Sequence, residues 1–199
     1  MRLPPLTPRS GGGLCIDQAA LKPADIVVST TDAAVSGVIR FFTGAPISHA
    51  MLYAGSGEAI EAVGEGVRRT ALNNALAHGR LAVAYRYKGL PDDAASKVVD
   101  YADAQARRHA PYDTPGAIGA GANTNKLVCV VALGIACPAV AGGALNQKDS
   151  FFCSELVLEA FQRAGYPISK IPPGSAGPDR ILEAYSHGVL TYVGHILTN

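Results

Sequence analysis

Residues 150–161 read Ser-Phe-Phe-Cys-Ser-Glu-Leu-Val-Leu-Glu-Ala-Phe, and they are the most informative part of the chain. Its apolar side chains recur at the spacing of one helix face, at positions Phe152, Leu156, Val157, Ala160 and Phe161. Ser150 or Asp149 can cap the start of such a helix, and Gly165 can end it. The pattern therefore predicts a helix that carries Cys153 in its first turn, with the sulfur toward the core.

The position of Cys153 at a helix start has chemical consequences. The N-terminus of a helix carries positive potential and unpaired N–H groups, which lower the pKa of a thiol and can hold an oxyanion. The alternative is an ordinary buried core cysteine, and the helix taken alone favours that alternative. A nucleophile needs a base elsewhere in the chain.

A second segment supplies a candidate base. Residues 47–63 predict a hairpin with a strand from His49 to Ala54, a Gly-Ser-Gly turn and a strand from Glu58 to Val63. If the turn centres on Gly55, His49 lies directly opposite Glu61. Cross-strand partners have Cβ atoms about 4.5–5.5 Å apart, so the carboxylate can hold one imidazole nitrogen. A helix-start cysteine together with a paired histidine indicates nucleophilic catalysis.

The histidine segment Ile47–Tyr53 and the cysteine segment Phe152–Val157 together resemble the permuted NlpC/P60 (papain-like) cysteine hydrolases, and most closely the YiiX-like permuted amidase branch. In ordinary members the cysteine helix precedes the histidine strand, whereas here it follows. Three further segments resemble the family more weakly: Ala24–Val28, Ala110–Asp113 and Gly177–Ile181. The resemblance covers roughly residues 20–195.

The resemblance implies a fold and a site. The fold is α+β, a circularly permuted papain-like (NlpC/P60) fold in which an antiparallel sheet or barrel packs against the cysteine-bearing helix. Cys153 is expected to be the nucleophile, His49 the general base and Glu61 the residue that orients the imidazole. The substrate is expected to contact the remaining candidates, which are Tyr112, Ser48 and Ser154. No cofactor is expected.

Composition excludes several classes of protein. Charged residues make up 17% of the 199 residues and the formal net charge is +1, which argues against nucleic acid as a partner. The small basic groups, Arg68-Arg69 and Arg107-Arg108-His109, are interpreted as solvated surface. No C-x-x-C or H-E-x-x-H motif is present, so no metal site is expected. The sequence leaves open whether Cys15, Cys129 and Cys137 form disulfides.

The chain divides into a predicted mobile N-terminal arm at 1–20 and one catalytic domain at 21–199, with an apolar helical insertion near 116–145. The arm lacks the apolar core of a secretory signal, which predicts a cytoplasmic protein or export by a signal-independent secretion system. Residues 127–145 are uncharged and close to bilayer-spanning length. A buried helix ending near Pro138 is favoured over membrane contact.

The other elements are placed coarsely. A short helix is predicted at Ala33–Phe42, and a longer one that Asp92 or Asp93 caps and that runs through Arg108. Strands are predicted at Gly66–Thr70, Leu81–Tyr87 and Thr191–Leu197. Helices and antiparallel strands in separate runs indicate the α+β class.

Three functions remain open from the sequence. The first is a cysteine hydrolase that cleaves amide bonds, a peptidoglycan amidase or endopeptidase, with an antibacterial effector toxin and its immunity or delivery partner as one form of it. The second is a hydrolase or acyltransferase directed at lipid or N-acyl groups, which the apolar run 127–145 would serve. The third is a non-catalytic binding protein on the same fold, against which Cys153, His49 and Glu61 argue.

Overall fold

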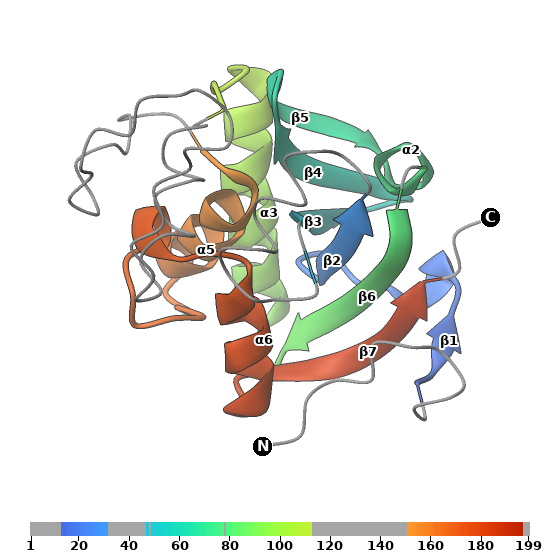
Figure 1. Cartoon of the computed structure of the whole chain (residues 1–199). Helices are drawn as coiled ribbons and strands as arrows, with labels where there is room; N and C mark the ends of the chain where they lie inside the picture. Colours follow the sequence, from blue (N-terminus) through green and yellow to red (C-terminus); the bar gives the residue numbers. More distant parts are fainter. Residues whose placement is uncertain (1–12, 32–46, 48, 78, 113–150, 197–199) are drawn as a thin grey trace, which may run out of the picture.

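Seven strands form one curved sheet, with the order β1-β7-β6-β2-β3-β4-β5 (Figure 1). The computed structural model describes residues 13–31, 47, 49–77, 79–112 and 151–196. The strands are β1 (Cys15–Ile16), β2 (Ile26–Thr31), β3 (His49–Gly55), β4 (Glu58–Val63), β5 (Gly66–Ala71), β6 (Gly79–Tyr87) and β7 (Leu190–Ile196). Neighbouring strands of this sheet run antiparallel except β1 and β7, which are parallel.

The sheet buries both of its faces, because alternate residues of each strand pack in opposite directions. Three helices gather on one side of the sheet in Figure 1: α3 (Asp92–Arg107), α5 (Cys153–Arg163) and α6 (Asp179–Ser186). There, Leu52 and Ile60 join a core that includes Leu156 of α5. On the opposite face, Met51 and Ala59 pack with the short helix α2 (Leu72–Leu76).

This arrangement of helices and a mostly antiparallel sheet confirms the α+β class. The strands predicted at Gly66–Thr70, Leu81–Tyr87 and Thr191–Leu197 are present as β5, β6 and β7, with some ends displaced by one or two residues. The helix predicted at Ala33–Phe42 and the apolar insertion near 116–145 lie outside the described residues.

The two long helices begin differently from the predictions. Helix α5 starts at Cys153 with Phe152 as its N-cap, and the Phe152 N–H donates to the Glu155 carboxylate at 3.3 Å. The proposed caps, Ser150 and Asp149, lie outside the described residues. Helix α3 has Pro91 as its N-cap, so its two aspartates sit in the first turn and stabilise the helix through its dipole rather than as caps.

The C-terminal end of α5 follows the prediction. Gly165 takes a left-handed backbone conformation, with φ of 86°. Its N–H donates to the Gln162 carbonyl at 3.0 Å, and the Tyr166 N–H donates to the Phe161 carbonyl at 2.9 Å. These two bonds close the helix in the manner of a Schellman motif, which favours glycine at this position.

The second part of the predicted N-terminal arm belongs to the sheet instead. Cys15 and Ile16 form β1 beside β7, in register with His195 and Ile196. The His195 N–H donates to the Leu14 carbonyl at 2.7 Å. Backbone pairing at the free edge of β7 holds this segment, a long-range contact that composition does not reveal. Two short 3₁₀ turns, η1 (Gln18–Ala20) and η3 (Pro173–Ser175), complete the described elements.

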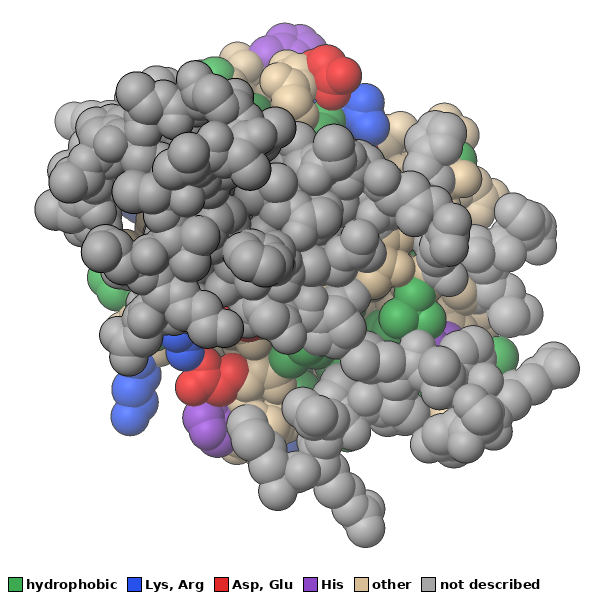
Figure 2. Space-filling model, in the orientation of Figure 1, with side chains coloured by type: hydrophobic (Ala, Val, Ile, Leu, Met, Phe, Trp, Pro, Cys, Tyr) green, Lys and Arg blue, Asp and Glu red, His purple; other side chains and the backbone are tan. Residues whose placement is uncertain are grey.

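Charges of both signs are interspersed on the visible described surface. Figure 2 shows acidic and basic side chains next to one another on this face, rather than a patch of one sign. Within the described segments, no helix is long and apolar enough to cross a membrane.

Gly66 at the start of β5 offers a test of how tightly the sheet edge packs. Its φ is 112°, and a Cβ added there would lie 2.8 Å from the carbonyl oxygen of Ala110, which accepts the Val67 N–H. We expect Gly66→Ala to lower the free energy of unfolding by about 1–3 kcal/mol, because both backbone strain and a backbone clash result. Thermal or urea unfolding measures this change.

Gly64 provides the matched control for this substitution. It precedes the same strand, and a Cβ added there would have no atom within 4 Å. Gly64→Ala should therefore change the unfolding free energy little. Equal effects of the two substitutions would contradict the packing described at Gly66.

Candidate active site

Cys153 lies at the N-terminal end of α5 and is 2% exposed. Hydrogen bonds to two other segments hold the residues on either side of Cys153. The Phe151 N–H donates to the Pro111 carbonyl at 2.9 Å, and the Ser154 hydroxyl donates to the Ala176 carbonyl at 3.1 Å. These bonds fix the first turn of α5 against two other segments, so the position of the sulfur is set by the fold.

His49, the first residue of β3, makes a short contact with a buried carboxylate. Its Nε2 lies 2.7 Å from Oε2 of Glu61 on β4. The exposed fractions of the two side chains are 14% for the histidine and 2% for the glutamate. The pairing of these two residues that the sequence suggested is thus present in the structure.

The register that brings the two together differs from the predicted one. Glu61 lies opposite Met51, not His49. The turn centres on Ser56 instead of Gly55, because Gly55, Ser56 and Gly57 all adopt positive φ and the pairing shifts between Tyr53 and Gly55. A displacement of two residues keeps both side chains on the same face of the sheet, so His49 reaches Glu61 diagonally.

His49 also hydrogen-bonds to Cys153. The backbone N–H groups of Ala50 and Ser154 hydrogen-bond to the same sulfur. The structure therefore places Cys153, His49 and Glu61 in one chain of hydrogen bonds.

The electrostatics of this chain favour a thiolate and an imidazolium. Burial alone raises the pKa of Cys153, but the hydrogen bond and charge of His49, with the two backbone N–H groups, outweigh burial and lower that pKa. For His49, burial lowers the pKa, but the interactions with Cys153 and Glu61 outweigh burial and raise the pKa to about 10. Proton transfer from the thiol to the imidazole is thus favoured in the resting protein.

Arg68 completes the surroundings of Glu61. Its Nε and Nη2 lie 2.9 and 2.8 Å from Oε1, the carboxylate oxygen that His49 does not use. Burial raises the pKa of Glu61, and the contacts with His49 and then Arg68 lower it below its ordinary value. The carboxylate is therefore ionised although it is buried.

The interpretation of Arg68 as solvated surface is wrong in this respect. The Arg68 side chain is 47% exposed, but its guanidinium binds Glu61. The sequence held a usable signal: a two-residue turn at Gly64-Glu65 between the predicted strands places Arg68 directly opposite Glu61, as observed. Arg69, on the other face, pairs with Glu58 and Asp103.

Ser29 is a second residue that the sequence did not indicate. It lies on β2 directly opposite His49 and is 1% exposed. Within the described part of the chain, its hydroxyl has no hydrogen-bond partner. His49 is therefore flanked by a hydroxyl on one neighbouring strand and a carboxylate on the other.

The three residues predicted to contact substrate have different outcomes. Tyr112 bridges to Phe151 and packs against Phe152, beside the start of α5. Ser154 is fully buried and its hydroxyl is engaged with Ala176, so this side chain serves the protein interior rather than a ligand. Ser48 lies outside the described residues.

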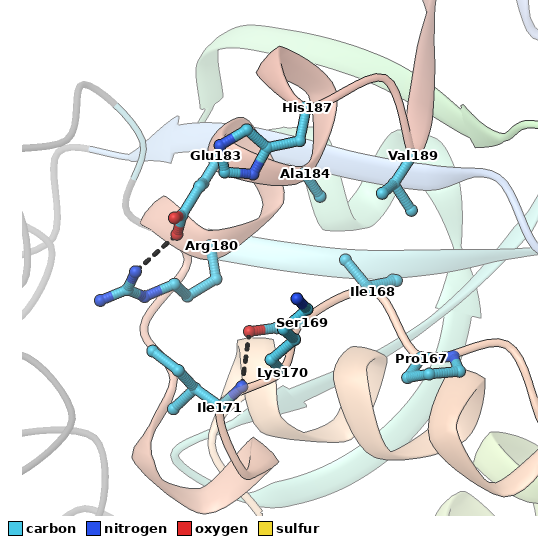
Figure 3. Close-up of a pocket in the computed structure, with 10 residues that line it drawn as sticks. All are labelled: Pro167, Ile168, Ser169, Lys170, Ile171, Arg180, Glu183, Ala184, His187 and Val189. Carbon is cyan, nitrogen blue, oxygen red and sulfur yellow. Dashed lines mark hydrogen bonds and ion pairs between the residues drawn. The ribbon is translucent and has the colours of Figure 1, made fainter.

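A cavity of about 500 Å³ lies away from this site (Figure 3). It opens between α6 and the segment that follows α5, and both apolar side chains and polar ones line it, the polar ones being Ser169, Lys170, Arg180, Glu183 and His187. Its lining begins at Pro167, past the C-terminal end of α5, whereas Cys153 stands at the other end of that helix. The cavity is therefore a separate feature.

The described residues contain no group of three or more histidine, cysteine, aspartate or glutamate side chains that could hold a metal ion. Cys15 and Cys153 are both free thiols. Cys129 and Cys137 lie outside the described ranges.

Comparisons with known proteins give two findings. The chain is 25% identical over 198 residues to the probable lipoprotein peptidase YaeF of Escherichia coli (strain K12), covering 88% of this chain and 71% of that protein. It also superposes on the crystal structure of metalloprotein yiiX from Escherichia coli O157:H7, with a TM-score of 0.58 and 18% identity, over 89% of this chain and 97% of that one. No family model matches the chain. The chain thus shares its fold with yiiX and is similar in sequence to a probable peptidase.

Proposed function

We propose that the protein is a cysteine hydrolase of the YiiX-like, permuted NlpC/P60 group and that it cleaves amide bonds. The observation that carries the proposal is the hydrogen-bonded chain from Cys153 through His49 to Glu61, at the N-terminus of a helix. The similarity to a probable lipoprotein peptidase supports the same class of reaction. A permuted papain-like arrangement fits the order of the elements, with the histidine strand before the cysteine helix.

In the proposed mechanism the Cys153 thiolate attacks the carbonyl carbon of the amide. Backbone N–H groups at the start of α5 stabilise the negative charge that develops on the carbonyl oxygen. The His49 imidazolium gives its proton to the nitrogen, the C–N bond breaks, and the amine leaves behind a thioester. His49 then takes a proton from water, which attacks the thioester, the C–S bond breaks, and a carboxylic acid leaves while the Cys153 thiolate and the His49 imidazolium are restored.

Glu61 has a supporting role in this proposal. Its carboxylate fixes the imidazole through Nε2 and stabilises the positive charge that the ring carries while the thiolate is free. The non-catalytic alternative is disfavoured because a buried thiol, imidazole and carboxylate in one chain are costly to retain without chemistry for them to perform.

Peptidoglycan is the first substrate that we propose, since its stem peptides contain the amide bonds such an enzyme cleaves. The lipid-directed alternative depends on residues 127–145, which lie outside the described structure. Incubation with purified peptidoglycan and, separately, with N-acyl lipids, followed by mass spectrometry of the products, distinguishes the two. Release of new amino groups from neither substrate would count against the amidase proposal. An effector-toxin role stays a prediction from the sequence.

Substitutions at the three residues should affect turnover in a graded way. Cys153→Ala should abolish it, because no other group can form the thioester, and His49→Ala should lower it by about 10²–10⁴-fold. Glu61→Gln should retain partial activity, since an amide oxygen still accepts a hydrogen bond from the imidazole but stabilises its cation less. Hydrolysis by each purified variant is the measurement, with Cys15→Ala as the control. Wild-type turnover by Cys153→Ala would end the proposal.

The pH dependence of thiol alkylation tests the ion pair without a substrate. A free thiol has a pKa of about 8.5. The rate at which iodoacetamide modifies Cys153 should therefore reach half its maximum at a pH well below that value. Burial slows the alkylation of Cys153 at every pH, so the midpoint of the pH dependence is compared rather than the absolute rate. In His49→Ala the midpoint should move upward. An unchanged midpoint in that variant would mean that the imidazole does not ionise the thiol.

The raised pKa of His49 predicts the behaviour of the enzyme in alkali. The imidazolium is needed to protonate the leaving nitrogen, and it loses its proton as pH rises through about 10. We therefore expect kcat/KM to hold across neutral pH and to fall on the alkaline side near that value. A profile that already falls near pH 6.5 would show an ordinary imidazole instead.

A further inference from the structure

We propose that Arg68 is a positioning residue of the active site, which holds the Glu61 carboxylate in the orientation and charge state that His49 and Cys153 require. The inference rests on the proposed function, because it assigns a further residue to the same site. It concerns a side chain on β5, a strand that contributes none of the three residues named for the reaction.

Geometry provides the first argument. Glu61 and Arg68 are directly opposed on β4 and β5, so their side chains leave the same face of the sheet. Both Nε and Nη2 of the guanidinium contact Oε1, at 2.9 and 2.8 Å, while Oε2 contacts His49 Nε2 at 2.7 Å. The two oxygens of one carboxylate are thus divided between the arginine and the histidine, which leaves the carboxylate no free rotation.

Charge provides the second argument. A carboxylate that is 2% exposed is costly to ionise unless a cation compensates it. The imidazole of His49 is an intermittent cation in the proposed reaction, because it gives up its proton in each cycle. A guanidinium keeps its charge at every accessible pH. Arg68 is therefore the permanent counter-charge that keeps Glu61 ionised when His49 becomes neutral.

The remaining charged groups near the site do not take this role. Glu65 lies 3.9 Å from the Arg68 guanidinium and is 81% exposed, so solvent screens it. Glu155 on α5 accepts a bond from the Phe152 backbone. Both are acidic, and neither supplies the positive charge that Glu61 needs.

Removal of Arg68 has two consequences for Cys153 that act in the same direction. A positive charge that favours the thiolate is lost, and Glu61 becomes easier to protonate, which weakens the imidazolium that stabilises the thiolate. We expect Arg68→Met to move the midpoint of Cys153 alkylation to higher pH, with a rate roughly three- to tenfold lower at pH values below the wild-type midpoint. Arg68→Lys, which keeps the charge, should recover at least half of this shift.

Arg69 is the matched control for this experiment. It neighbours Arg68 on β5, is similarly exposed at 37%, and pairs with Glu58 and Asp103 on the other face of the strand. Arg69→Met should leave the alkylation midpoint unchanged. An equal shift in both variants would show a general effect of net charge and would overturn the proposal, as would a wild-type midpoint in Arg68→Met.

A double variant tests whether Arg68 acts through Glu61. If it does, adding Arg68→Met to Glu61→Gln should shift the midpoint less than Arg68→Met does in the wild-type protein, because only the direct effect of the lost positive charge remains once the carboxylate is gone. A full additional shift would contradict the positioning role. Thermal melts establish that each variant is folded, and Arg68→Gln replaces Arg68→Met if the latter does not melt cooperatively.

These measurements separate the inference from the proposed function. Alkylation of Cys153 needs no substrate, so the shift can be present even if no amide is hydrolysed, in which case the hydrolase proposal alone fails. If amides are hydrolysed and Arg68→Met has the wild-type midpoint and kcat/KM profile, the role of Arg68 alone fails.

Discussion

A buried carboxylate shared between two cations is the interaction on which the rest of the site depends. Glu61 is almost fully removed from water, yet both of its oxygens have partners on the neighbouring strands, His49 on β3 and Arg68 on β5. An unpaired charge at this depth would neutralise itself by taking up a proton. Because it is paired, Glu61 stays ionised and stabilises the positive charge on His49. That positive charge in turn favours the thiolate of Cys153.

The alternation of side chains along a strand explains why the contact between His49 and Glu61 was predicted correctly although the predicted register was wrong by two residues. A displacement by one residue would move Glu61 to the opposite face and separate it from His49, whereas the observed displacement by two residues preserves the face. The diagonal contact is possible because an imidazole and a glutamate side chain are both long enough to cross it. The pairing of Glu61 with Arg68, in contrast, is directly opposed and needs no such reach.

Local patterns predicted most of the described elements and the pairing of His49 with Glu61, since helix periodicity, alternation and glycine turns are encoded within a few residues. The role of Phe152 as the N-cap of α5, the addition of β1 to the sheet edge and the burial of the Ser154 hydroxyl were not predicted. Each of these depends on a partner distant in the chain: Pro111 for the approach to α5, β7 for β1, and Ala176 for Ser154. Spacing within one segment carries no information about such partners.

The order of the elements along the chain matters less to this site than their places in space. The sulfur is presented by the first turn of a helix, and the imidazole and carboxylate by two strands of a hairpin that the helix packs against. No peptide bond between these pieces takes part in the proposed reaction, so a chain that makes the hairpin first can assemble the same hydrogen bonds as one that makes the helix first. Such a rearrangement keeps the site only if the guanidinium, carboxylate, imidazole and thiol remain in contact in this order. Its four members come from β5, β4, β3 and α5, and the sheet register sets the spacing of the first three.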